Sequence, residues 1–268
     1  MLRYTFYLCF WVLLADTSSL QNAVSPKIVF HEANDRILNG ENATLGQFPW
    51  QVAILSTTND SATWCSGSLI SEDWVLTAAH CVDGAIVADV YVGGVDLDDV
   101  AALVLADEFV VHEDYDASTL ANDIALVQLR TGLAFSDIIA PIALASDPLD
   151  AGVNITVSGF GQTSDDDIES IEFLHFITVT TIENTECSDI YEDVVILEEM
   201  VCASAGTDPF KSPCPGDSGA PGVINLDSDP FLVAITIFSS DTGCESGYPS
   251  GYTRVDHFRD WIQENSGV

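Results

Sequence analysis

Short apolar runs, many of them alternating with polar residues, fill most of this chain, and Gly, Asp, Asn or Pro separate one run from the next. Runs of this length that are rich in Val, Ile, Thr and aromatic residues predict β-strands. Many short strands joined by turns indicate an all-β barrel or sandwich. We expect strands at 51–55, 74–79, 87–92, 101–111, 124–129, 155–160, 173–182, 231–238 and 252–255.

Helical periodicity is confined to two segments. Four apolar residues near the end of the chain fall on one stripe, which predicts a C-terminal helix over 255–265. A second, shorter helix is expected over 184–191. The residues of the C-terminal stripe are Val255, Phe258, Trp261 and Ile262.

The N-terminus has the pattern of a secretory signal. Arg3 provides a positive start, and the apolar run 4–15 is too short to span a bilayer comfortably. A membrane anchor or a buried helix is the alternative, but polar residues follow at once and no later apolar run is long enough to span. We expect residues 1–18 to be a signal peptide, no transmembrane segment, and a protein secreted to the extracellular space.

Composition limits the function classes. The chain has 268 residues, of which 47% are apolar, so it can bury a substantial core. Its 42 Asp and Glu against 7 Lys and Arg give a formal net charge of -35, which disfavours binding to nucleic acid or to anionic membranes by simple repulsion. Partners are expected to be neutral or basic, and most carboxylates are expected on a solvated surface.

Removal of Cys9 with the signal peptide leaves an even number of cysteines, which fits disulfides in an oxidising compartment. Spacing alone does not choose among their pairings. No zinc spacing occurs, the acidic stretch 96–108 is better explained as a solvated loop than as a calcium site, and no metal or cofactor is expected. The six cysteines are Cys65, Cys81, Cys187, Cys202, Cys214 and Cys244, and glycosylation sequons begin at Asn42, Asn59 and Asn154.

Three motifs carry candidate chemistry. His80 lies in Leu-Thr-Ala-Ala-His-Cys, Asp123 in Asn-Asp-Ile-Ala-Leu, and Ser218 in Gly-Asp-Ser-Gly-Ala-Pro. A serine hydroxyl is a poor nucleophile unless a base accepts its proton, and that base needs an orienting carboxylate. We therefore assign Ser218 as nucleophile, His80 as base and Asp123 as orienting acid. Each motif alone is weak, since a serine between Asp and Gly is most often a turn residue; His112 also precedes Asp123 but lacks the Ala-Ala-His-Cys setting.

Together the three motifs resemble the chymotrypsin-like serine endopeptidases, the trypsin family, and the segment 243–255 is most similar to arthropod digestive chymotrypsins and brachyurins. The resemblance covers nearly all of residues 37–268. It implies two antiparallel six-stranded Greek-key barrels with a C-terminal helix, which we divide into an N-terminal barrel, 37–140, and a C-terminal barrel with the helix, 141–268. The crossing between the barrels is expected between Arg130 and Asp147.

The resemblance also implies how the enzyme is made. Residues 19–36 would be an activation propeptide, cleaved after Arg36 by a trypsin-like protease. The new ammonium of Ile37 would pair with Asp217 and so order the oxyanion hole, formed by the N–H groups of Gly216 and Ser218. The implied disulfides join sequential neighbours: Cys65 with Cys81, Cys187 with Cys202, and Cys214 with Cys244.

The preference for the substrate's P1 side chain is predicted from the residues that align with the family's primary specificity pocket. Ser212 aligns with its base, and Ser239 and Ser250 with its walls. An uncharged base favours large apolar or aromatic P1 side chains, because a buried cation would be left unpaired there. Asp241 lies nearby in sequence and could restore some basic preference. We expect a digestive protease, active as a monomer in a setting such as the gut lumen, with protein or peptide substrates.

Two alternatives to an active peptidase of this family exist. An α/β-hydrolase needs Gly-x-Ser-x-Gly and the order Ser, acid, His; position 220 is Ala and the strand-helix alternation is missing, which excludes it. The other is a catalytically weak or inactive homologue that works as a binding protein. Its basis is three departures from the family pattern: Ile237 for a serine that supports the catalytic aspartate, and Ser239 and Ala220 for glycines.

Overall fold

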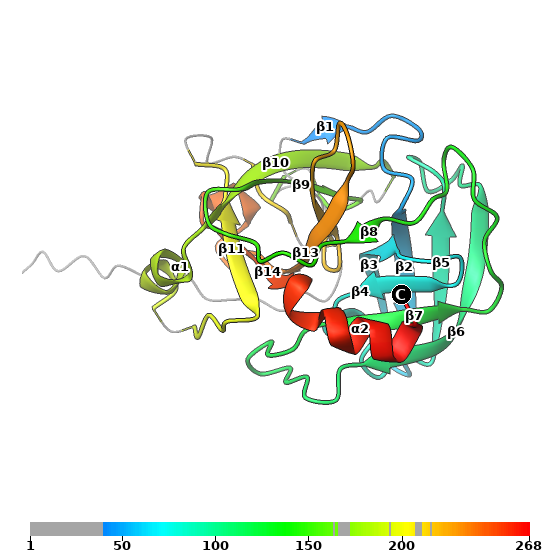
Figure 1. Ribbon diagram of the computed structural model, residues 1–268, viewed down its shortest axis with the longest axis horizontal. Helices are drawn as coiled ribbons and strands as arrows, with labels where there is room; N and C mark the ends of the chain where they lie inside the picture. Colours follow the sequence, from blue (N-terminus) through cyan, green and yellow to red (C-terminus); the bar gives the residue numbers. More distant parts are fainter. Residues whose placement is uncertain (1–39, 163, 166–171, 193, 207–210, 215) are drawn as a thin grey trace, which may run out of the picture.

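The computed structural model describes residues 40–268 except 163, 166–171, 193, 207–210 and 215. The predicted signal peptide, the propeptide, Arg36 and Ile37 lie outside these residues. Two β-barrels occupy the two sides of the molecule, and the chain ends in a helix placed over the first barrel (Figure 1).

The first barrel is closed by six strands in the order β2-β3-β4-β7-β6-β5, and all of its neighbouring pairs are antiparallel. Alternation of side chains along the strands places Val52, Ile54 and Val90 inside, each with no exposed surface. The strands are β2 (Gln51–Thr57), β3 (Ala62–Leu69), β4 (Trp74–Thr77), β5 (Val87–Val92), β6 (Ala102–Val111) and β7 (Ala125–Leu129).

The second barrel is a ring of six antiparallel strands, because β9 pairs with both β10 and β12. Two short strands extend it: β1 (Glu41–Asn42) pairs with β10, and β8 (Ala143–Leu144) runs parallel to β13. The ring consists of β9 (Asn154–Gly159), β10 (His175–Ile182), β11 (Met200–Ser204), β12 (Pro221–Ile224), β13 (Phe231–Phe238) and β14 (Ser250–Arg254). The expected fold class, two six-stranded antiparallel barrels with a C-terminal helix, is confirmed.

Helices are few and short. The C-terminal helix begins as a 3-10 turn, η3 (Asp256–Phe258), and continues as α2 (Arg259–Ser266), which packs against β7 (Figure 1). Among the described residues, no helix combines the length and the apolar character needed to cross a bilayer. The remaining helices are α1 (Asn184–Ile190) and the 3-10 turns η1 (Ala79–Cys81) and η2 (Cys244–Ser246).

Every strand expected from the pattern has a counterpart, but some ends differ. β4 stops at Thr77 rather than at residue 79, because Ala79 begins η1. β10 begins at His175 rather than at residue 173, since Phe173 forms only an isolated bridge with Asp96. Five of the described strands were not expected: β3, β11, β12 and the two-residue strands β1 and β8.

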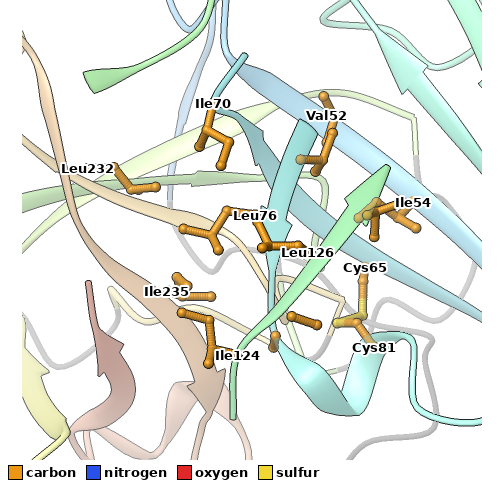
Figure 2. Packing of buried hydrophobic residues seen from close by; sticks show 14 of the residues in the cluster. Val52, Ile54, Cys65, Ile70, Leu76, Cys81, Ile124, Leu126, Leu232 and Ile235 are labelled. Carbon is orange, nitrogen blue, oxygen red and sulfur yellow. A yellow bond between two sulfur atoms is a disulfide. The ribbon is translucent and has the colours of Figure 1, made fainter. Parts of the chain in front are cut away.

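One buried apolar cluster joins the two barrels, and a second lies within the C-terminal barrel. Residues of the first barrel, such as Leu76, Ile124 and Leu126, belong to the same buried cluster as Leu232 and Ile235 of β13. Figure 2 shows these side chains facing one another, with the Cys65–Cys81 disulfide beside them. The two halves of the molecule are therefore packed together next to the turn that contains His80.

Candidate active site

The side chains of His80 and Asp123 are in direct contact. The Nδ1 atom of His80 lies 2.6 Å from Oδ2 of Asp123, and the backbone N–H of His80 donates to Oδ1 of the same carboxylate at 3.0 Å. Asp123 is fully buried, whereas the His80 side chain keeps 15% exposure. A carboxylate accepts the Nδ1 proton, so the Nε2 atom of His80 is the nitrogen left to act as a base.

The turn that contains His80 is fixed on both sides. Ala79, which precedes it, has no exposed surface. The residue that follows, Cys81, is joined to Cys65 of β3 by a disulfide, and its carbonyl accepts a 2.6 Å hydrogen bond from the Ser56 hydroxyl. The imidazole therefore leaves a rigid turn at the end of the first barrel's β4.

Asp123 is held by both barrels. Its preceding residue, Asn122, has φ of 54°, a left-handed conformation that Asn tolerates better than most residues. The hydroxyl of Thr253, on β14 of the second barrel, donates to the backbone carbonyl of Asp123 at 2.8 Å. Thr253 was not singled out from the sequence, because nothing local relates it to a residue 130 positions away.

Burial and Asp123 act in opposite directions on the His80 imidazole. Burial lowers the pKa of His80, but the charge of Asp123 and its hydrogen bond raise it, and the net result is a pKa above the usual 6.5. Asp123 therefore stabilises the imidazolium, which is the form His80 takes after it accepts a proton.

Ser218 lies on a turn that contacts the first barrel. Its carbonyl accepts a 2.7 Å hydrogen bond from the N–H of Ser66, the neighbour of Cys65. Gly219 has φ of 80°, and a Cβ there would overlap the Ser66 carbonyl oxygen and the Thr77 hydroxyl, so only glycine allows this approach. Ser218 is thereby placed near the disulfide beside His80, although within the described residues no hydrogen bond joins its hydroxyl to the imidazole.

The N–H groups of two residues on this turn have no acceptor among the described residues. Within the part of the chain that the structure describes, neither the N–H of Gly216 nor that of Ser218 donates a hydrogen bond. Gly216 has φ of 90°, which favours glycine at this point. Two unpaired donors beside a serine hydroxyl can stabilise an oxyanion that develops on a substrate carbonyl.

Asp217 is fully buried and is held by two backbone groups. The N–H of Gly161 donates to Oδ1 at 2.8 Å and that of Cys214 to Oδ2 at 2.9 Å. Burial raises the pKa of Asp217 well above 3.8, although these two bonds act to lower it. Among the described residues no side-chain cation pairs with Asp217.

Comparisons with known proteins identify the family. The Trypsin family model matches residues 37–262. This chain belongs to the trypsin family. A collagenase from Hypoderma lineatum is 37% identical over 268 residues, which cover 98% of both chains. A brachyurin from Leptuca pugilator is 34% identical over 235 residues, covering 87% of this chain and 99% of the relative.

A solved structure supports the same assignment. The structure titled HL collagenase matches this trypsin-family chain with a TM-score of 0.79 and 36% identity, covering 87% of this chain and 99% of the other. The chain is thus homologous to active serine endopeptidases.

Two glycines that the sequence did not single out, Gly159 and Gly161, make room for the carboxylate of Asp217. A Cβ at Gly159 or at Gly161 would overlap the carboxylate of Asp217. The Gly-Phe-Gly motif at the end of β9 can be seen in the sequence. Its role cannot, because it depends on the Asp217 carboxylate, which lies 56 residues beyond Gly161.

The residues aligned with the primary pocket are all buried. Phe238 pairs with Gly251 across β13 and β14, so Ser239 and Ser250 lie next to one another at the ends of these strands. The Ser250 hydroxyl bonds to the Tyr252 hydroxyl at 2.7 Å. Ser212 bonds locally to the Pro213 carbonyl, two residues before the Cys214–Cys244 disulfide.

The cysteines near the site form disulfides. The pairs are Cys65–Cys81, Cys187–Cys202 and Cys214–Cys244, the pairs that the resemblance implies. One group with metal-like proximity contains His80 with Cys65 and Cys81, but both sulfurs are consumed by their disulfide. That group therefore lacks the thiolates that a metal would need.

Proposed function

We propose that the protein is a secreted serine endopeptidase in which Ser218, His80 and Asp123 hydrolyse peptide bonds. The observation that carries this proposal is the 2.6 Å contact between the buried Asp123 carboxylate and His80 Nδ1. The Cys65–Cys81 disulfide holds the His80 turn beside β3, where the N–H of Ser66 donates to the carbonyl of Ser218. Membership of the trypsin family supports it.

The proposed reaction has two halves. His80 Nε2 accepts the Ser218 proton while the hydroxyl oxygen attacks the substrate carbonyl, and the imidazolium then gives that proton to the leaving amine. Water, activated by the same nitrogen, hydrolyses the acyl-enzyme and releases the carboxylate product. Asp123 fixes the tautomer and stabilises the charge on His80 during both halves.

The oxyanion that forms in each half needs donors. The unpaired N–H groups of Gly216 and Ser218 would supply them, in a turn that Gly219 holds against the first barrel. Donors fixed before the reaction lower the barrier more than mobile ones do, because no reorganisation accompanies the charge development.

The protein would be made as a zymogen. Cleavage after Arg36 by a trypsin-like protease would free the ammonium of Ile37. Asp217 is the acceptor that such a cation needs, since it is buried and no side-chain cation among the described residues pairs with it. A buried ion pair is strongly orienting, since either charge alone is costly in that position. Arg36 and Ile37 lie outside the described residues, so this step rests on the sequence and on the state of Asp217.

Substrate preference would be for large apolar or aromatic P1 side chains. Ser212, Ser239 and Ser250 are buried and uncharged, and a cationic P1 side chain would find no carboxylate among them. Relatives named collagenase, brachyurin and trypsin-1 support protein substrates.

The test is covalent labelling of Ser218. The chain is cleaved at Arg36 and treated with a fluorophosphonate; we expect stoichiometric labelling at Ser218, lost in His80→Ala and retained in His257→Ala, which removes an exposed histidine outside the triad. A cleaved wild-type protein that stays unlabelled would support the competing function, an inactive homologue that binds its partner. A library of P1 side chains then measures the preference.

A further inference from the structure

Both cysteines of the Cys214–Cys244 disulfide donate their backbone N–H to a carboxylate. Cys214 donates to Asp217 at 2.9 Å, and Cys244 donates to Oδ1 of Asp165 at 2.8 Å. The N–H of Glu245 also points to Asp165 and reaches Oδ2 at 3.3 Å. Asp217 belongs to the proposed oxyanion turn, but Asp165 has no role in the reaction described above.

The two carboxylates are connected through one short segment. Gly161 donates its N–H to Asp217, and Asp165 follows only four residues later. Two hydrogen bonds and the disulfide therefore link Asp217 to Asp165 in series, through Cys214 and Cys244.

Asp165 is exposed overall, but its carboxylate lies directly against the turn that it binds. Gly243 has φ of 101°, and a Cβ on it would overlap the Asp165 carboxylate. Charge-assisted hydrogen bonds to two successive N–H groups hold such a turn more strongly than neutral ones. The loop 240–249, which contains this turn, connects Ser239 to Ser250, the two proposed walls of the primary pocket.

We propose that Asp165 is a positioning residue for the primary specificity pocket: it holds the loop between Ser239 and Ser250 and thereby sets the width of the pocket. This role rests on the proposed function, because the pocket matters only if the protein cleaves peptides. Asp165 does not touch the reacting atoms, so it should affect which side chain is accepted far more than the rate of bond cleavage.

The experiment compares Asp165→Ala, Asp165→Asn and Asp147→Ala in the activated full-length protein. Asp147→Ala is the charge control, since it removes an exposed carboxylate that accepts no hydrogen bond from any described residue. For peptides with P1 Phe we expect Asp165→Ala to raise KM about fivefold and to change kcat less than about twofold. Asp165→Asn keeps one acceptor oxygen for Cys244 and should retain most of the wild-type KM.

The discriminating measurement is the ratio of kcat/KM for P1 Phe to that for P1 Ala, per fluorophosphonate-labelled molecule. A loss of folded protein lowers both values equally, whereas a pocket of altered width changes the ratio. The role of Asp165 is refuted if Asp165→Ala leaves the ratio unchanged or matches Asp147→Ala. Absence of labelling in the wild-type protein would instead contradict the proposed function itself.

Discussion

Asp123 is the residue on which the chemistry of the site depends most directly. Both of its carboxylate oxygens bind His80, and its backbone carbonyl is held by Thr253 of the other barrel. The family pattern has a serine in support of this aspartate where the chain has Ile237, which is buried and apolar. The bonds from His80 and Thr253 show that Asp123 is nevertheless well oriented without that hydroxyl.

Asp123→Asn should change both the rate and its pH dependence. Without the carboxylate the His80 tautomer is lost, so we expect kcat to fall by roughly 10⁴-fold. The pKa of His80 should also fall from above 6.5 to below it, because the effect of burial remains and the two raising effects of Asp123 disappear. The acid limb of kcat/KM against pH reports this directly; an unchanged limb would contradict the assignment.

Asp217 should make the uncleaved protein sensitive to pH. Its folded-state pKa is raised, so the folded state holds the proton more tightly than the unfolded chain, and stability falls as pH rises from about 3.8 through the folded pKa. As pH rises above about 4 and through the raised pKa of Asp217, the uncleaved protein should therefore lose stability relative to Asp217→Asn.

Cleavage after Arg36 should reverse that loss, since the new ammonium neutralises Asp217. In a Ser218→Ala background, which prevents self-digestion, we expect the Tm at pH 7 to rise on cleavage by roughly 5–10 °C in the presence of Asp217. Asp217→Asn should show little change. Equal shifts in the two proteins would mean that Asp217 is not the partner of the new terminus.

At the level of secondary structure, the strands that could be predicted are those whose own residues favour a strand. β5 and β13 were expected with the bounds they have, because Val, Ile and Phe dominate them. β3 was missed since Cys65 to Ser68 are small residues, and β12 since it begins with Pro-Gly. Their strand conformation comes from pairing with distant partners, which local sequence does not encode.

The same distinction applies to the candidate site. The motifs around His80, Asp123 and Ser218 are contiguous and could be assigned from the sequence. Thr253 and Asp165 could not, because each acts through one hydrogen bond to a residue far away in the chain.

Two disulfides that close loops of similar length allow a matched test of how the Cys65–Cys81 bond supports the His80 turn. Cys65–Cys81 closes 16 residues beside His80, and Cys187–Cys202 closes 15 residues between α1 and β11. Replacing either pair by alanines should cost about 3 kcal/mol of unfolding free energy. Only loss of Cys65–Cys81 should also lower kcat at a temperature where both variants are folded, because it frees the His80 turn; equal kcat values would contradict that.

The whole molecule is dominated by negative charge. Residues 1–36 contain as many Asp and Glu as Lys and Arg, so their removal leaves the formal charge of -35 unchanged. A field of this size attracts cationic polypeptides over distances comparable with the Debye length.

Activity toward basic proteins should therefore depend on salt. When NaCl is raised from about 20 mM to about 500 mM, we expect kcat/KM for a cationic protein substrate to fall tenfold or more. A neutral peptide with the same P1 residue is the control and should change little. Similar salt dependence for both substrates would show that the charge affects the enzyme itself rather than the approach of its substrate.

The C-terminal helix ends the second half of the chain but is anchored to the first. Trp261 of α2 donates to the Glu113 carboxylate at 3.0 Å and its ring lies 5.1 Å from that of His112. Besides the shared apolar cluster and the hydrogen bonds between the barrels, the halves are held together by the covalent connection after β7 and by this returning helix. A single nick in that connection would consequently leave one particle on a native gel and two fragments on a denaturing one.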